Sequence, residues 1–135
     1  TYIHTGGKIA SIVEINCETD FAAKSPIFNN LCELICLQVV AMQPIYVSKE
    51  DISEEQISLQ IENMGKYYSS IISVKDEREK ELFINEKMKN WYREVVLMEQ
   101  TSVIDQSKSI KELVESTSAQ LGEKVQIARF ERWSI

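Results

Sequence analysis

Residues 25–44, SPIFNNLCELICLQVVAMQP, decide the fold of this chain because they read as a long apolar helix. Ser25 is a typical N-cap, Pro26 suits the first helical position, and Gln43 followed by Pro44 ends the pattern. The apolar residues recur at helical spacing and form a wide stripe made of Phe28, Leu31, Cys32, Leu34, Ile35, Leu37, Val39, Val40 and Met42. We therefore predict that this helix is the buried centre of the domain.

A β-hairpin is predicted before this helix. Residues 2–4 and 9–16 read as strands, and the pair Gly6 and Gly7 between them tolerates the positive φ of a tight turn. In the second strand the apolar side chains at odd positions fall on one face, whereas Ile12 lies on the other. Apolar residues on both faces indicate a sheet that is partly covered.

More helices are predicted after residue 50. Helical patterns cover residues 53–67, 76–99 and 109–121, and Gly122 ends the last of them. The first and last begin with capping boxes, formed by Ser53 with Gln56 and by Ser109 with Glu112.

The chain closes with a predicted strand over residues 124–133, in which Val125 and Ile127 lie on one face and Phe130 on the other. The order of elements lacks the strict alternation of a parallel α/β fold. We therefore predict a single α+β domain over residues 1–135, with a small antiparallel β-sheet packed against several α-helices.

The composition excludes two classes of partner. The 135 residues are 44% hydrophobic and 27% charged, which is typical of one globular domain with its own core. The net charge of -6 argues against direct nucleic-acid binding, because such binding needs clustered lysine and arginine. No apolar run reaches the length of a membrane span, so no membrane association is expected.

A small thiol or zinc protein is one alternative that the sequence leaves open. Cys17, Cys32 and Cys36 are an odd number of cysteines, which favours a reducing compartment, and His4 is the only histidine. Cys32 and Cys36 share one face of the apolar helix. We therefore predict buried free thiols and no metal or other cofactor.

We recognise no catalytic constellation in the sequence. Nucleophilic catalysis needs a nucleophile, a base and an orienting group, and no known nucleophile motif surrounds Cys17. Residues 6–8, GGK, are not a phosphate loop, because the upstream glycine, the following hydroxyl and the helix are missing. A binding or regulatory protein is predicted rather than an enzyme.

Residues 16–21, NCETDF, are the strongest candidate for a binding site. They connect the strand at residues 9–16 to the central helix and place Asp20 beside Phe21 on a short connection. Connections held by rigid elements on both sides commonly present binding groups. Burial preference alone favours a phenylalanine that folds back into the core, and the other possibility is contact with a partner.

Three parts of the chain together resemble the translation elongation factor Ts family, the nucleotide-exchange factors of elongation factor Tu. They are YIHTGGKI with NCETDFAAK in residues 2–24, KMK with EVVLMEQ in residues 87–100, and LGEKVQIARF in residues 121–130. They occur in the family's order and span nearly the whole chain. The resemblance implies the short form of the family's core, or dimerisation, domain and therefore a homodimer.

The resemblance also implies a function, namely guanine-nucleotide exchange on elongation factor Tu, bound in its GDP and nucleotide-free states. It assigns the contact and the displacement of Mg²⁺ to Thr19, Asp20, Phe21 and Ala22. The phenylalanine would enter the partner's nucleotide-binding domain, the aspartate would disturb the metal site, the threonine would shape the turn, and the alanine would add a small packing contact. The alternative is an interaction module without exchange activity.

Some family features differ in this chain. Ala22 stands where the family motif Thr-Asp-Phe-Val has valine, and Thr101 and Ser102 replace the usual Pro-Phe. The family's amino-terminal, ubiquitin-associated-like module has no counterpart here, and the chain starts at Thr1 in strand-like sequence, so we expect an amino-terminal portion of the natural protein to be missing. The resemblance is compatible with a bacterial cytoplasm or with an organelle such as the chloroplast stroma.

Overall fold

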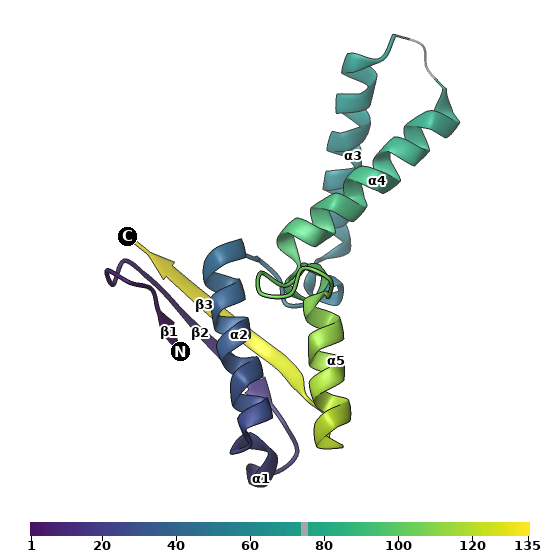
Figure 1. The fold of residues 1–135 in the computed structure, drawn as a ribbon. Coiled ribbons are helices and arrows are strands. Elements are labelled where there is room, and N and C mark those ends of the chain that lie inside the picture. Colours follow the sequence, from purple (N-terminus) through teal and green to yellow (C-terminus); the bar gives the residue numbers. More distant parts are fainter. Residues whose placement is uncertain (74–75) are drawn as a thin grey trace.

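The computed structural model has the predicted α+β architecture and describes residues 1–73 and 76–135 (Figure 1). Its elements, in chain order, are β1 (Tyr2–Ile3), β2 (Ile9–Asn16), α1 (Asp20–Ala23), α2 (Pro26–Met42), η1 (Lys49–Asp51), α3 (Glu54–Ile71), α4 (Glu77–Val95), η2 (Leu97–Glu99), α5 (Ile110–Leu121) and β3 (Gln126–Ser134). Helix α2 lies along the sheet and packs beside α5, whereas α3 and α4 project from this body as an arm (Figure 1).

Helix α2 is the central helix that the sequence predicts. The Ser25 hydroxyl accepts a hydrogen bond from the Phe28 N–H at 3.2 Å, and Gln43 ends the helix in the left-handed region with φ 51°. The main core joins α2 to η2, α5 and β3, and its buried members are Phe28, Leu31, Ile35, Val39, Leu97, Ile110, Val114, Val125 and Ile127. Each large aliphatic or aromatic side chain buried there contributes about 1.5–3 kcal/mol.

The sheet is antiparallel with the order β1-β2-β3, which confirms the hairpin and the closing strand. In β2 the side chains at positions 11, 13 and 15 face α2. The Ser11 hydroxyl donates to the Cys36 carbonyl at 2.9 Å, while Val13 and Ile15 pack on the main core. Ile12 points away from α2 and is exposed, as expected for the other face.

The expected orientation of Phe130 is wrong, and a β-bulge is the reason. Val13 pairs with Phe130 and Ile15 pairs with Ile127, so Ala128 is an extra residue on β3. Residues opposite each other in a sheet share a face, and the bulge therefore returns Phe130 to the face of Ile127. Both side chains contact the main core.

The helix caps agree with the predicted capping residues in most respects. Both halves of the Ser109–Glu112 capping box form at the start of α5. At α3 the Ser53 hydroxyl accepts from the Gln56 N–H at 3.2 Å, and the helix continues past Tyr67 to Ile71. Ile57 packs against the small core cluster of Ile52, as a hydrophobic staple would.

Helix α4 ends at Val95, earlier than the predicted Glu99. The N–H groups of Ile45 and Tyr46 both donate to the Val95 carbonyl, at 2.8 and 3.0 Å, and the Leu97 N–H donates to the Tyr46 carbonyl at 2.8 Å. The chain after Val95 therefore bonds to the segment that follows α2, which stops the helix and starts η2.

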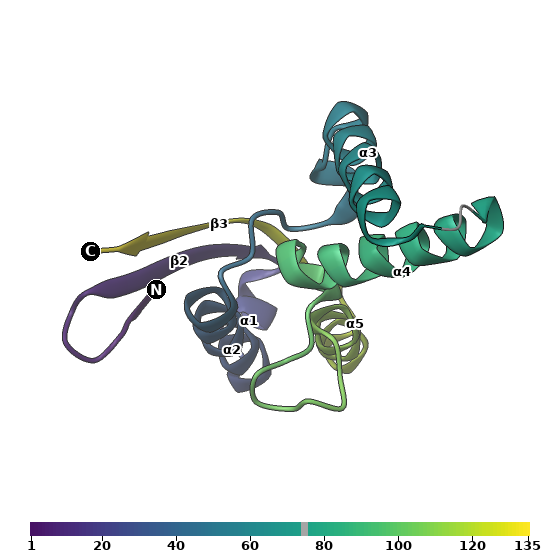
Figure 2. The ribbon, with the colours of Figure 1, turned by 90° about the horizontal axis from the view of Figure 1, so that it is seen from above.

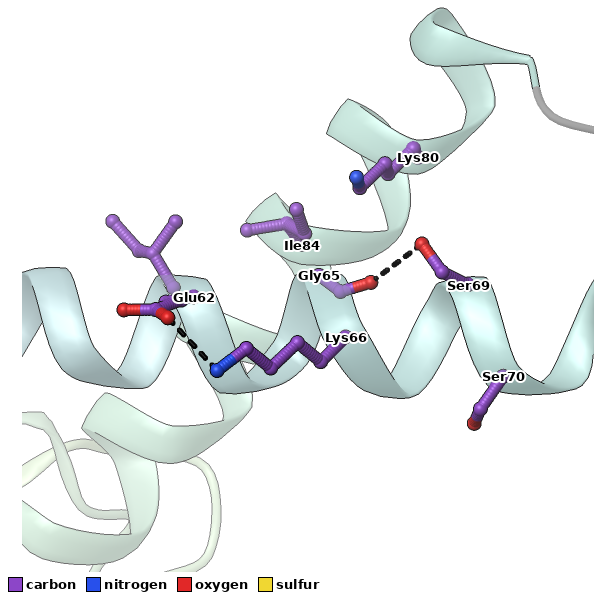
Figure 3. Close-up of a pocket in the computed structure, with 8 residues that line it drawn as sticks. Glu62, Gly65, Lys66, Ser69, Ser70, Lys80 and Ile84 are labelled. Carbon is purple, nitrogen blue, oxygen red and sulfur yellow. Dashed lines mark hydrogen bonds and ion pairs between the residues drawn. The ribbon is translucent and has the colours of Figure 1, made fainter.

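The arm is held together where α3 and α4 cross (Figures 1 and 2). Phe83 of α4 packs on Tyr68 of α3 with ring centroids 5.2 Å apart. On the side shown in Figure 3, Gly65 of α3 lies against Lys80 and Ile84 of α4. A Cβ atom at Gly65 would lie 3.4 Å from Lys80 Cε and 3.7 Å from Ile84 Cδ1, so the two helices leave room there for a methyl group. In residues 1–73 and 76–135, no helix combines the length and the apolar character needed to cross a membrane.

Two buried glutamines connect α2 to the segment after η2, a contact that no pattern in the sequence predicts. Gln38 donates to the Gln100 side chain at 3.2 Å and to the Thr101 carbonyl at 3.0 Å, and accepts from the Val103 N–H at 2.9 Å. Gln100 donates to the Glu94 carbonyl at 2.8 Å. Because both amides are fully buried, these bonds offset the cost of removing them from water.

Candidate functional site

Residues 19–22 are the N-cap and the first three residues of α1, a single helical turn between β2 and α2. The predicted connection is therefore itself helical, and Thr19 is its N-cap. The Thr19 Oγ1 atom accepts a hydrogen bond from the Ala22 N–H at 3.2 Å. Asp20 occupies the first helical position, where the exposed backbone N–H groups favour a negative charge.

Phe21 extends into solvent, with 89% of its surface exposed. Burial preference alone predicted a ring folded into the core, and the structure shows the opposite arrangement. A free phenylalanine ring leaves a large apolar area in water, and that area is available to a second protein. Asp20 beside it is also exposed, so an acid and an aromatic ring project together from one turn.

Ala22 lies on the inner side of α1 and is only 3% exposed. Successive residues of a helix point about 100° apart, so an outward Phe21 is compatible with an inward Ala22. Ala23 also packs against the main core. The Ala22 side chain therefore anchors the turn to its own domain, and a small packing contact with a partner stays a prediction.

Glu123 holds the start of this turn, a role that no motif in the sequence predicts. Its Oε1 atom accepts the backbone N–H groups of Glu18 at 3.0 Å and Thr19 at 2.9 Å. Its Oε2 atom accepts the Thr19 hydroxyl at 2.6 Å. Glu123 follows the helix-ending Gly122, but no local pattern pairs it with a residue more than 100 positions earlier.

His4 and Cys17 lie at opposite ends of β2. The His4 N–H donates to the Ile9 carbonyl at 2.8 Å, and the His4 ring contacts the Tyr2 hydroxyl at 3.2 Å, whereas Cys17 follows the last residue of the strand. The Cys17 thiol donates to the Thr19 carbonyl at 3.3 Å. The structure therefore does not bring the histidine to Cys17 or to Asp20.

The remaining thiols lie in the core. Cys36 is buried and Cys32 is partly buried, and burial raises the pKa of the Cys32 thiol, with a smaller contribution from Cys36. A raised pKa favours the neutral thiol, whereas metal binding and nucleophilic attack need the thiolate. Within the described residues, no group of three or more metal-ligating side chains converges.

Comparison with known proteins gives consistent matches over the whole chain. A family model described as "Elongation factor TS" matches residues 1–135. The chain is 40% identical to elongation factor Ts of Coprothermobacter proteolyticus, an alignment that covers 99% of this chain and 67% of the relative. It is 36% identical to elongation factor Ts of Thermotoga petrophila (99% and 65%) and 40% identical to that of Trichodesmium erythraeum (100% and 61%). The chain thus spans about two thirds of the length of these curated relatives.

Proposed function

Because this chain belongs to the elongation factor Ts family of translation elongation factors, we propose that it is a guanine-nucleotide exchange factor for elongation factor Tu. Residues 1–135 act in this proposal as a single core domain. The relatives reported above are bacterial, which supports a site of action in a bacterial cytoplasm or in an organelle with bacterial-type translation.

The exposed Phe21 ring is the observation that carries this proposal. An aromatic side chain that is 89% exposed on a capped turn gains most of its burial energy only when a partner covers it. That energy, on the order of 3 kcal/mol, is large enough to offset a local distortion of the partner's nucleotide site. Phe21 therefore acts as a wedge in the nucleotide-binding domain of elongation factor Tu.

Asp20 acts on the metal side of the same site. GDP is held in proteins of this kind by backbone donors of a phosphate loop and by Mg²⁺ bridging to protein ligands. A carboxylate brought close to that metal disturbs the water molecules and protein ligands around it, so GDP binds less tightly. The coupling is reciprocal, so GDP weakens binding of the factor by the same ratio, and no covalent step is needed. GTP then occupies the emptied site and the factor leaves.

A homodimer through the outer face of the sheet is the second part of the proposal. The outer face is the side of the sheet away from α2, and Ile3, Ala10 and Trp133 form a row across its strands, with Ile12 beside it. Ile3 is 70% exposed and Trp133 is 57% exposed. Such a row favours coverage by another apolar surface, and two-fold self-association is the commonest way to provide one.

An interaction module without exchange activity is the competing function. It would bind elongation factor Tu through a surface other than α1 and leave GDP release unchanged. A pull-down that survives Phe21→Ala, together with unaltered GDP release, would support this alternative.

Stopped-flow release of a fluorescent GDP from elongation factor Tu tests the exchange function. We expect Phe21→Ala to lower the release rate by about 100-fold, because about 3 kcal/mol of partner burial is lost. The free domain should keep its stability within about 0.5 kcal/mol, since the ring is exposed. Ile104→Ala, which removes another exposed apolar side chain, is the matched control. Equal rates for the wild type and Phe21→Ala would refute the wedge.

A further inference from the structure

Helix α1 is too short to hold its own conformation. It has four residues, and a helix of one turn is unstable without hydrogen bonds from outside. The reason is that ordering the backbone of the first turn costs more free energy than the hydrogen bonds of that turn contribute. Ala22 and Ala23 pack the end of the turn on the core, so the direction in which Phe21 points also depends on what fixes the residues at the start of the turn. Those residues, Glu18 and Thr19, are exposed, so core packing does not fix them.

Glu123 is fixed independently of α1. Gly122 ends α5 in the left-handed region with φ 66°, and the Glu123 N–H then donates to the Ser118 carbonyl at 3.3 Å. The Ser118 hydroxyl donates in turn to the Glu123 carbonyl. Both backbone groups of Glu123 are thus bonded to α5, a helix whose residues Ile110 and Val114 belong to the main core.

The Glu123 carboxylate connects this frame to α1 by a relay. Its Oε2 atom accepts a hydrogen bond from the Thr19 hydroxyl, which leaves a lone pair of the Thr19 oxygen directed at the Ala22 N–H. Its Oε1 atom satisfies the Glu18 and Thr19 N–H groups. A charged acceptor makes each of these bonds stronger than a neutral one would be.

We propose that Glu123 is a positioning residue for nucleotide exchange, which acts through Thr19 to hold α1 so that Asp20 and Phe21 face the partner. This inference rests on the proposed exchange function. Glu123 does not contact the partner's nucleotide site; it fixes the wedge before binding, so that binding energy is not used to order the turn.

The two oxygens of the carboxylate make glutamine an informative substitution. In Glu123→Gln the Oε1 atom still accepts the Glu18 and Thr19 N–H groups, but the Nε2 group can only donate. It cannot accept the Thr19 hydroxyl and instead competes with Ala22 for the Thr19 oxygen. Thr19→Val removes the same relay from the other end, and Thr19→Ser preserves it.

The test combines GDP release with amide hydrogen exchange at Ala22. We expect Glu123→Gln and Thr19→Val each to slow factor-stimulated GDP release by roughly tenfold, because the wedge is misplaced and not removed. The double variant should be no slower than either single variant, since one relay is broken in each case. Thr19→Ser should remain within about twofold of the wild type. Glu115→Gln, at an exposed glutamate of α5, controls for the loss of charge.

Hydrogen exchange separates failure of this inference from failure of the proposed function. The Ala22 amide should exchange faster in Glu123→Gln and in Thr19→Val, and at the wild-type rate in Thr19→Ser. If the Ala22 amide keeps its wild-type rate in Glu123→Gln, or if the two substitutions slow GDP release additively, Glu123 is not a positioning residue. The exchange function itself is judged separately by Phe21→Ala in the same assay.

Discussion

Four consecutive side chains at the start of α1 have different surroundings, and this division explains how one turn can serve as a binding site. Thr19 caps the turn, Asp20 and Phe21 are exposed, and Ala22 is buried against its own domain. An inward anchor and a bonded cap leave the backbone of the outward pair with little freedom. A turn that is already ordered loses less entropy on binding than a mobile one, which favours contact with a partner.

At the residue scale, the role of Asp20 can be separated from that of Phe21 by the metal. We expect Asp20→Asn to reduce the rate of stimulated GDP release by roughly tenfold when Mg²⁺ is present, because a neutral amide disturbs the ligands of the metal less than a charged carboxylate does. In excess EDTA the metal is already gone, so the difference from the wild type should disappear. Stopped-flow release under both conditions measures this.

The control for that measurement is Phe21→Ala, whose defect should persist in EDTA because it does not depend on the metal. A deficit of Asp20→Asn that is the same with and without Mg²⁺ would contradict the proposed action on the metal site. Asp20 would then contribute by contact with the partner alone.

The sequence predicted part of this site and could not predict the rest, for a physical reason. Asp20 and Phe21 were identified by their place between β2 and α2 and by the motif around them, and the capping of Thr19 follows a local pattern. Glu123 could not be predicted, because its three hydrogen bonds span more than 100 residues and depend on where the chain leaves α5 before β3. Periodicity reports local structure and carries no information on such contacts.

At the scale of elements, the same distinction between local and long-range contacts accounts for two of the errors in the fold. A bulge at Ala128 adds one residue to β3 and reverses the face of Phe130. The alternation of apolar and polar residues in the sequence does not reveal such an extra residue. Helix α4 ends early because the segment at Tyr46 bonds to Val95 and Leu97. The elements with strong local signals, such as α2 and α5, were predicted with nearly correct bounds.

Two glycines in or next to helices should respond oppositely to alanine. A Cβ atom at Gly65 would lie 3.4 Å from Lys80 Cε and 3.7 Å from Ile84 Cδ1, which is ordinary contact, so Gly65→Ala should stabilise α3 by about 0.5–1 kcal/mol. Gly122 has φ 66°, and Gly122→Ala should cost about 1 kcal/mol although no atom lies within 4 Å.

Urea unfolding followed by far-UV circular dichroism measures both changes, and each variant serves as the control for the other. Destabilisation by Gly65→Ala would mean that the arm helices cannot yield to a methyl group, which would contradict the room seen beside Lys80 and Ile84 (Figure 3). Gly122→Ala should also weaken the relay from Glu123, because it disturbs the helix end that places this residue.

At the scale of the whole molecule, α1, α2 and α5 lie on one side of the sheet, whereas α3 and α4 project from this body (Figure 2). On the outer face, Ile12 and Trp133 remain exposed. The main core lies between α2, α5 and the inner face, so the domain does not need the outer face for its own stability. Around the apolar row the outer face becomes polar, and the pair of Glu14 and Arg129 at 2.6 Å lies beyond Ile12. An apolar centre with a polar rim is the usual composition of a protein interface.

Ile12→Lys should therefore separate a dimer without unfolding the monomer. Position 12 lies opposite Glu131, so in the monomer the new lysine gains an oppositely charged neighbour on β3. In a two-fold dimer the substitution places two lysines in the buried interface, and we expect the dissociation constant to rise by at least roughly 100-fold. Sedimentation equilibrium measures that constant, and Leu82→Lys on the exposed face of α4 is the control. A wild-type chain that stays monomeric at high concentration, or an Ile12→Lys variant that associates as the wild type does, would contradict pairing through this face.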